Sequence, residues 1–382
     1  MTLSITDAIL STQIFTVIFL LFVLASVKAR KDNQIFPLAT THELKGLAIL
    51  MVVFSHIGYF LTSDHQFLFP LSIAAGVGVN LFLFLSGYGL AVSNQHKPQT
   101  IGQFYGRRLI RLLLPVWIVL TIFFLLDYFI LHLAYGSQYI AQSFLGYFPT
   151  ADLYHDIDSP LWYFTLILFY YLIFPIFYSR RRPWLSAAII YLLSYFIILW
   201  QPPALQNVLG LYKVHFAAFP LGIAFAWLLS KPDWFKLSWL KKMLWRFKKP
   251  SLDKLIVKSF GYAGYYALFA VLLAVTAYTA YYSNIGGGMF KEQLTSLITM
   301  SAIVLLFLIK KFEFKLFALF GTFSYEIYLL HWPAMSRYNI FFTLLPSWLA
   351  VTLYLAIFLA LGWLLHRLTG WALRKVMPKA RA

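Results

Sequence analysis

The sequence predicts an all-α, polytopic membrane protein with about eleven transmembrane helices, its N-terminus outside and its C-terminus in the cytoplasm. Of its 382 residues, 61% are hydrophobic and only 12% are charged, whereas soluble proteins carry about a quarter charged residues. Apolar stretches of about twenty residues, each long enough to cross a hydrocarbon core of about 30 Å, recur along the whole chain. The basic residues also fall almost entirely on one side of these stretches.

The apolar stretches place the expected helices in chain order. The first of them lies where a signal peptide would, but residues 1–7 contain no Lys or Arg and the apolar run is long, so we expect a transmembrane helix. No repeat and no soluble domain is expected between the spans. The predicted spans are 8–27, 44–62, 72–93, 109–133, 160–178, 184–200, 214–230, 259–282, 292–309, 316–334 and 346–366.

The distribution of positive charge sets the expected orientation. With the N-terminus outside, all but three of the 31 Lys and Arg residues lie on the inner side, the exceptions being Lys213, Lys291 and Arg337. This asymmetry is the one that membrane insertion imposes on cytoplasmic loops. The formal net charge of +18 therefore reflects topology, and we expect no nucleic-acid partner.

Two segments outside the spans have a distinctive composition. The stretch 231–258 is rich in Lys with interleaved Trp, which is typical of an amphipathic element on the lipid surface; a nucleic-acid or donor site is the alternative. The loop 134–159 carries Asp152, Asp156 and Asp158 and no Lys or Arg. A loop of this length is often functional, so it forms either part of an acceptor site or a solvated acidic surface.

Lys45 and His56 lie eleven positions apart in an otherwise apolar segment. Eleven helical steps of about 100° return to within roughly 20° of the start, so both side chains are expected on one helix face, about 16 Å apart. Ionisable residues inside a membrane usually face a protein interior or a water-filled cavity. His56 is therefore a candidate general base in the outer half of the membrane. A hydrogen-bonded core histidine is the alternative.

A pair of arginines lies at the cytoplasmic end of the fourth predicted span. Arg108 and Arg111 are three residues apart and are therefore neighbours on one helix face. Two guanidinium groups side by side suit phosphate binding, because each presents paired donors in one plane. The alternative is that both arginines only set the topology.

The tenth predicted span contains a polar motif. Glu326 is a carboxylate inside an apolar helix, so it needs a partner or a proton. His331 and Trp332 lie near the outer boundary, where aromatic belts form, and an interfacial role is the alternative for both. We therefore expect Glu326 to be the more important residue.

Two further polar residues lie inside predicted spans. Asn80 is followed by a Ser-Gly pair, for which tight helix packing is the favoured interpretation. Asp127 is a lone acid that either lines a cavity or pairs with a base. The chain has no Cys, which excludes disulfides and thiolate chemistry. Its histidines do not show metal-ligand spacing, so no metal is expected.

The order of these motifs resembles the acyltransferase 3 family of integral membrane proteins, over about residues 41–366. Any single motif is weak, whereas four in this order are specific. One departure is Asn80, where members often have aspartate. The matching motifs are Lys45 with His56 after ten intervening residues, the segment Phe82 to Tyr88, the Arg-x-x-Arg pair Arg108 and Arg111, and the motif Ser324-Tyr325-x-x-Tyr328-Leu329-x-His331.

The resemblance implies a domain organisation. Residues 41–382 would form the ten-helix membrane domain with its basic cytoplasmic tail, and residues 1–40 would add a helix and a basic linker. Many members continue into an extracytoplasmic hydrolase-like domain, and this chain ends at Ala382 without one, so a stand-alone member is expected. The expected location is a bacterial plasma membrane.

The resemblance also implies an activity. Members transfer an acyl group, most often acetyl from acetyl-CoA, to a sugar hydroxyl of an envelope or secreted glycan or its lipid-linked precursor. Arg108, Arg111 and Lys45 would then hold the phosphates of the donor. His56 would deprotonate the acceptor or carry the acyl group itself. Glu326 would orient the imidazole of His56, as the acid of a catalytic triad does.

A proton-coupled transporter or flippase is the alternative function. Lys45, His56, Asp127 and Glu326 would then form a proton pathway. Against this, the sequence has no repeated halves and no paired broken helices of the kind that mark transporter sites. A non-catalytic sensor is the least favoured function, because Lys45, His56 and both arginines are all present.

Overall fold

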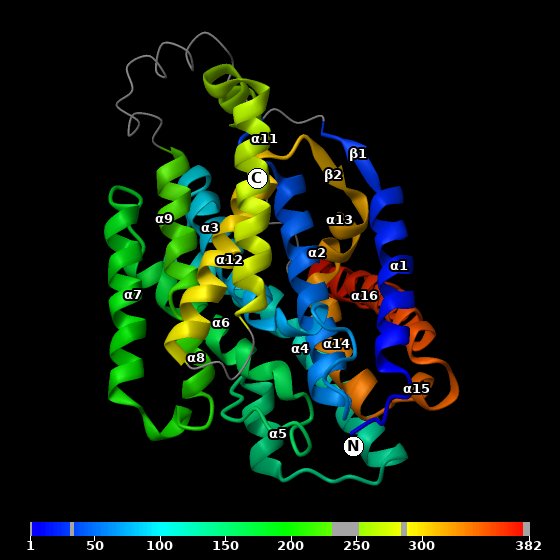
Figure 1. Cartoon of the computed structure of the whole chain (residues 1–382). Helices are drawn as coiled ribbons and strands as arrows, with labels where there is room; N and C mark the ends of the chain where they lie inside the picture. Colours follow the sequence, from blue (N-terminus) through cyan, green and yellow to red (C-terminus); the bar gives the residue numbers. More distant parts are fainter. Residues whose placement is uncertain (1, 31–33, 231–251, 284–288, 377–382) are drawn as a thin grey trace.

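Long apolar helices make up most of the protein and confirm the predicted all-α, multi-span fold. The computed structural model describes residues 2–30, 34–230, 252–283 and 289–376. Within these ranges ten helices are long and apolar enough to cross a membrane. They run between two ends of the molecule, with the N-terminus at the lower end of Figure 1. Most of the basic element predicted at 231–258 lies outside the described residues.

The helices mostly follow the predicted spans and extend several of them. A π-helical turn, His56–Leu61, continues α2, and 3-10 turns cover Leu71–Ile73, Ser159–Leu161 and Pro203–Leu205. The helices are α1 (Ala8–Ala25), α2 (Leu38–Ser55), α3 (Ala75–His96), α4 (Ile101–Ile130), α5 (Ser137–Phe144), α6 (Trp162–Phe177), α7 (Pro183–Trp200), α8 (Leu209–His215), α9 (Ala218–Ser230), α11 (Leu252–Tyr281), α12 (Met289–Ile309), α13 (Lys315–Thr322), α14 (Ser324–Ser336), α15 (Phe341–Leu344) and α16 (Ser347–Val376).

The span predicted at 316–334 is not one continuous helix. It is divided into α13 and α14 at Phe323, whose φ of −110° and ψ of 15° are not helical. The local sequence explains the break, because Gly321 is a poor helix former. The Ser324 hydroxyl also donates to the Gly321 carbonyl at 3.1 Å, and such side-chain bonds compete with the helical ladder.

α2 and α13 are packed with their backbones in direct contact. A Cβ atom placed on Gly46 would lie 1.8 Å from the Phe317 carbonyl oxygen, and one on Gly321 would lie 1.7 Å from the His42 carbonyl oxygen. Only glycine fits at either position. Small residues that allow close approach are the usual basis of helix association in membranes, so this contact fixes α13 against α2.

A short sheet, which the hydropathy pattern did not predict, joins the C-terminal ends of α1 and α12. Strands β1 (Val27–Ala29) and β2 (Phe312–Phe314) pair antiparallel, with Val27 opposite Phe314. Beneath them, Lys310 Nζ lies 2.6 Å from Glu43 Oε1, and both side chains are buried. The Phe314 backbone N–H donates to the same carboxylate oxygen at 2.5 Å. Glu43 therefore links α2 to β2.

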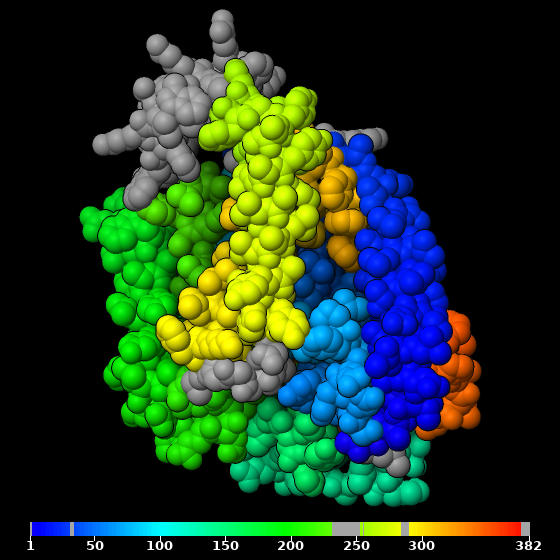
Figure 2. Space-filling view, in the orientation of Figure 1, coloured from blue at the N-terminus to red at the C-terminus, as the bar shows by residue number. Residues whose placement is uncertain are grey.

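Two helices lie at the periphery of the bundle. Figure 2 shows α11 as a separate ridge across one face of the molecule, with α1 at its edge. Only 6% of the α11 span is buried within the protein. α1 is attached more firmly, because Phe15 is fully buried and its ring lies 5.4 Å from that of Phe54 in α2.

We expect Glu43→Ala to lower the free energy of unfolding by about 3–5 kcal/mol, because it leaves the Lys310 ammonium group buried without its partner. Thermal unfolding of the purified protein in detergent measures this change. The double variant Glu43→Leu with Lys310→Met should recover most of the loss, since apolar replacement of both partners is close to neutral.

Glu313→Ala is the matched control. Glu313 pairs with Lys315, and their side chains are 12% and 48% exposed. Water can solvate the Lys315 ammonium group when Glu313 is removed, so the loss should cost about 1 kcal/mol, less than that of Glu43. Equal unfolding temperatures for Glu43→Ala and Glu313→Ala would contradict a structural role for the buried pair.

Candidate active site

Two histidines from distant parts of the chain meet inside the bundle. His56 lies at the C-terminal end of α2 and His331 lies in α14. His56 Nδ1 is 2.7 Å from His331 Nε2, and the two rings are nearly parallel, at 6°. His331 is fully buried, whereas His56 is only half-buried. His56 is therefore the member of the pair that a substrate can reach.

The contacts of His331 determine which nitrogen carries the proton in each ring. His331 Nδ1 lies 2.8 Å from the Tyr328 carbonyl oxygen and 3.1 Å from the Ile327 carbonyl oxygen, so it must be a donor. In a neutral imidazole the other nitrogen is then an acceptor. His331 Nε2 consequently accepts from His56 Nδ1–H. This leaves His56 Nε2 with its lone pair, in the form that a general base or a nucleophile requires.

Aromatic rings surround the pair. The Trp332 ring lies 5.2 Å from that of His56, and Phe60 packs on His56 at 5.7 Å. The indole Nε1 of Trp332 is buried and has no hydrogen-bond partner within the described residues. An unsatisfied buried donor costs about 1–3 kcal/mol, so its position beside a reactive imidazole suggests a functional role.

α14 brings the rest of its motif to the same side. Residues three positions apart are neighbours on a helix, and Tyr325, Tyr328 and His331 follow this spacing. The Tyr325 hydroxyl donates to the Leu112 carbonyl of α4 at 2.5 Å. The Tyr328 hydroxyl donates to the Pro160 carbonyl at 2.7 Å. The motif therefore anchors α14 to α4 and to the start of α6.

Glu326 does not occupy the position that the sequence analysis expected. Its Oε1 lies 2.7 Å from His366 Nδ1 on α16, while the nitrogen of His56 that a triad carboxylate would hold contacts His331. Lys45 is half-buried, and the charge of the Glu326 carboxylate on α14 acts on it. This agrees with the shared face that the eleven-residue spacing of Lys45 and His56 predicts, because His56 also contacts α14. The contact with the His56 imidazole that we expected of Glu326 is made by His331.

The two arginines lie on the first turns of α4, at the end of the bundle that we call the basic end. Arg108 is half-buried and its Nη2 donates to Ser93 Oγ of α3 at 2.9 Å. Arg111 is exposed. Because Leu112 accepts the Tyr325 hydrogen bond, these arginines lie beside the start of α14. The structure therefore connects them to the helix that carries His331.

At the opposite end, Asp127 is paired with a base that the sequence analysis did not identify. Arg337 Nη1 lies 2.5 Å from Asp127 Oδ2, and Asp127 is fully buried. The hydroxyls of Tyr135 and Tyr338 donate to the same carboxylate at 2.5 and 2.8 Å. Arg337 also donates to the Asp156 carbonyl at 2.6 Å. This cluster holds the 134–159 loop against the helices.

Asp158 has a different environment from the other acids of that loop. It is 4% exposed, and neither carboxylate oxygen has a partner in the part of the chain that the structure describes. It lines a hollow of about 10 Å³ whose other walls are apolar, among them Leu161 and Leu329. Burial raises the pKa of Asp158 well above its usual range, and the charge of Arg337 offsets only part of this effect.

A second buried polar network crosses α3, α8 and α12. His215 Nδ1 lies 2.9 Å from Asn80 Oδ1, and Asn80 Nδ2 donates to Ser296 Oγ at 3.0 Å. His215 was not among the predicted site residues, because its sequence neighbours Val214 and Phe216 are apolar and indicate no polar site. The contact gives Asn80 a hydrogen-bonding role in addition to the packing role that we expected.

The fold and site together define a class: a multi-span membrane protein with a half-buried imidazole, oriented for proton transfer or nucleophilic attack. A family model described as an acyltransferase domain, that of acyltransferase 3, matches residues 44–367. The chain therefore belongs to the acyltransferase 3 family and is a membrane acyltransferase. No match to the chain was found among curated proteins or among solved structures.

We expect His331→Phe to lower kcat for acyl transfer by at least about tenfold with little change in KM, because nothing then fixes the proton on His56 Nδ1. His331→Gln should recover part of the rate, since its amide oxygen can accept the same hydrogen bond. His96→Gln, at the exposed end of α3, is the control. Equal rates for His331→Phe and His331→Gln would argue for packing alone.

We expect Asp158→Asn to change the pH dependence of stability. The pKa of Asp158 is higher in the folded protein than in the unfolded chain, so above about pH 4 the folded state binds more protons and its stability falls as pH rises. Asparagine does not titrate, so the variant does not lose stability in this way as pH rises. The unfolding temperature of the variant, relative to wild type, should therefore rise between pH 4 and pH 8.

For Asp152→Asn, the unfolding temperature relative to wild type should instead fall as pH rises. Backbone N–H donors of Tyr154 and His155 lower the pKa of Asp152 to about 2, so its contribution is present at neutral pH and is lost on acidification. A pH-independent difference for Asp158→Asn would contradict its burial as an unpaired acid.

Proposed function

We propose that this membrane acyltransferase transfers acetyl from acetyl-CoA to a sugar hydroxyl of an envelope or secreted glycan, or of its lipid-linked precursor, in a bacterial plasma membrane. The observation that carries the proposal is the His56–His331 contact, which leaves His56 Nε2 as a free acceptor. Arg108 and Arg111, in the N-terminal part of α4, provide a cationic site for an anionic donor.

The donor binds at the basic end, which we assign to the cytoplasm because cytoplasmic segments carry the excess of Lys and Arg. Arg108 and Arg111 bind the diphosphate of the donor, because paired guanidinium groups are suited to bind phosphate. Lys45, on α2, lies between these arginines and His56 along the path of the donor. The pantetheine arm then extends along α14 towards His56.

In the reaction, His56 Nε2 accepts the proton of the sugar hydroxyl as its oxygen attacks the thioester carbonyl. The new C–O bond forms, the C–S bond breaks, and the CoA thiolate takes the proton back from His56. In the covalent alternative, Nε2 attacks the carbonyl first, the C–S bond breaks, and CoA leaves as the thiolate from an acylated His56. The sugar hydroxyl then attacks the acyl carbon, the C–N bond breaks to restore the imidazole, and the hydroxyl proton passes to the CoA thiolate. Either route develops an oxyanion, and the unpartnered Trp332 N–H beside His56 is a suitable donor to it.

The proposal is tested by CoA release from acetyl-CoA, with purified protein in proteoliposomes and with or without crude envelope glycan. Because the chain has no Cys, a thiol reagent detects only the released CoA. We expect glycan-stimulated release that falls by about 10²-fold or more in His56→Ala. Arg111→Ala should mainly raise KM for acetyl-CoA. Size-exclusion profiles control for folding of each variant.

Two results would contradict this proposal in different ways. Near-normal release by His56→Ala would remove His56 from catalysis. No release by well-folded wild type, with any acyl donor or glycan, would instead favour the transport function and call for flux measurements under a proton gradient. Radiolabelled acetyl retained on the protein when glycan is omitted would select the acyl-imidazole route.

A further inference from the structure

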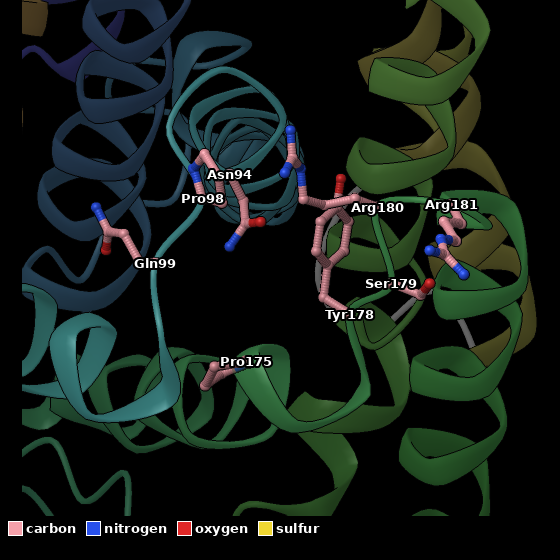
Figure 3. Close-up of a pocket in the computed structure, with 8 residues that line it drawn as sticks. All are labelled: Asn94, Pro98, Gln99, Pro175, Tyr178, Ser179, Arg180 and Arg181. Atoms are coloured by element: carbon pink, nitrogen blue, oxygen red, sulfur yellow. The ribbon is translucent and has the colours of Figure 1, made fainter.

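A cavity with a volume of about 410 Å³ opens at the basic end of the molecule. It lies between the C-terminal end of α3, the α3–α4 connection and the turn that joins α6 to α7 (Figure 3). Its volume is within the range of about 300–1,000 Å³ that ligand pockets occupy. No residue that we assigned to the active site lines it.

The walls of this cavity are held in place before any ligand binds. The Tyr178 hydroxyl donates to the Ala91 carbonyl at 3.3 Å, and Arg180 Nη2 donates to the Gln95 carbonyl at 2.8 Å. The Ser179 backbone N–H donates to Ser186 Oγ of α7 at 2.8 Å. These bonds tie the α6–α7 turn to both α3 and α7, which reduces the entropy cost of binding.

The lining combines cationic, amide and flat apolar groups. In Figure 3 the Asn94 amide points into the space bounded by Pro175 and the Tyr178 ring, while Arg181 extends away from it. Arg180 uses one nitrogen for the Gln95 carbonyl, and its guanidinium has further N–H donors for an anion. A planar base between an aromatic ring and a proline, with a phosphate on the arginine, matches this set.

The cavity is adjacent to the donor arginines in the fold. Asn94 follows Ser93, whose hydroxyl accepts the 2.9 Å hydrogen bond from Arg108 Nη2. A ligand that fills the cavity and continues past Ser93 therefore reaches Arg108. This is the arrangement that a nucleotide joined to a diphosphate arm requires.

We propose that this cavity binds the adenosine 3′-phosphate end of the CoA donor, with Arg180 donating to the 3′-phosphate and Asn94 to the base. The inference rests on the proposed function, because it assumes a CoA thioester as donor. An anionic lipid headgroup also carries a phosphate that Arg180 could bind. Such a headgroup has no planar base, however, so it would make no stacking contact with Tyr178 and Pro175.

Titration calorimetry of the full-length protein in detergent, with adenosine 3′,5′-bisphosphate as the probe, tests the inference. We expect saturable binding to wild type and binding about tenfold or more weaker to Arg180→Gln and Asn94→Ala, since each loses a hydrogen bond, that of Arg180 to a charged group. Adenosine 5′-monophosphate should bind wild type more weakly than the bisphosphate does. Its affinity for wild type and for Arg180→Gln should be the same. Arg182→Gln is the matched control, from the same turn but outside the cavity lining.

Four results of the binding measurement overturn the inference. They are no binding of the bisphosphate to wild type, equal affinity for wild type and Arg180→Gln, an equal loss with Arg182→Gln, and displacement of the bisphosphate by phosphatidylglycerol with no preference over the monophosphate. His56-dependent CoA release that is unaffected by Arg180→Gln and Asn94→Ala would overturn this pocket and leave the proposed function intact. Absence of CoA release from wild type, despite bisphosphate binding, would instead count against the proposed function.

Discussion

Backbone contact between α2 and α13 fixes the position of the helix that carries most of the site. Gly46 and Gly321 let the two backbones meet where any Cβ would overlap a carbonyl oxygen. Because α14 resumes directly after the break at Phe323, this contact sets both its distance from α2 and its rotation. His331 consequently reaches His56, and the imidazole pair depends on a glycine in the middle of α2 and on one in α13.

Several polar side chains inside the bundle pair across helices, because an unsatisfied group in a low-dielectric interior is costly. Glu43 bonds to Lys310, and Asp127 to Arg337. The Trp332 indole nitrogen and the Asp158 carboxylate, in contrast, are buried without partners among the described residues. The first lies against His56, where a bound substrate would supply the missing partner. The second lines a hollow of about 10 Å³ near α14, which has room for about one water molecule.

Sequence patterns predicted the helices and the shared face of Lys45 and His56, because both follow from local periodicity and hydropathy. They did not predict which side chain would hold the imidazole. Glu326 was the chemically reasonable choice, but His331 lies five positions further along α14 and reaches His56 across 275 positions of sequence. Contacts of that kind depend on helix rotation and on the break at Phe323, neither of which hydropathy encodes.

α14 links the proposed donor site on α4 to the proposed catalytic imidazole on α2. Its 13 residues extend for about 20 Å, or about two thirds of a hydrocarbon core. Tyr325 binds α4 beside the arginines and His331 binds the imidazole on α2. Misplacement of a reacting group by about 1 Å can cost about 10²-fold in rate. In the proposed reaction, a donor held by α4 and a base held by α2 keep a constant separation because one short helix is bonded to both, and this makes α14 a positioning element between them.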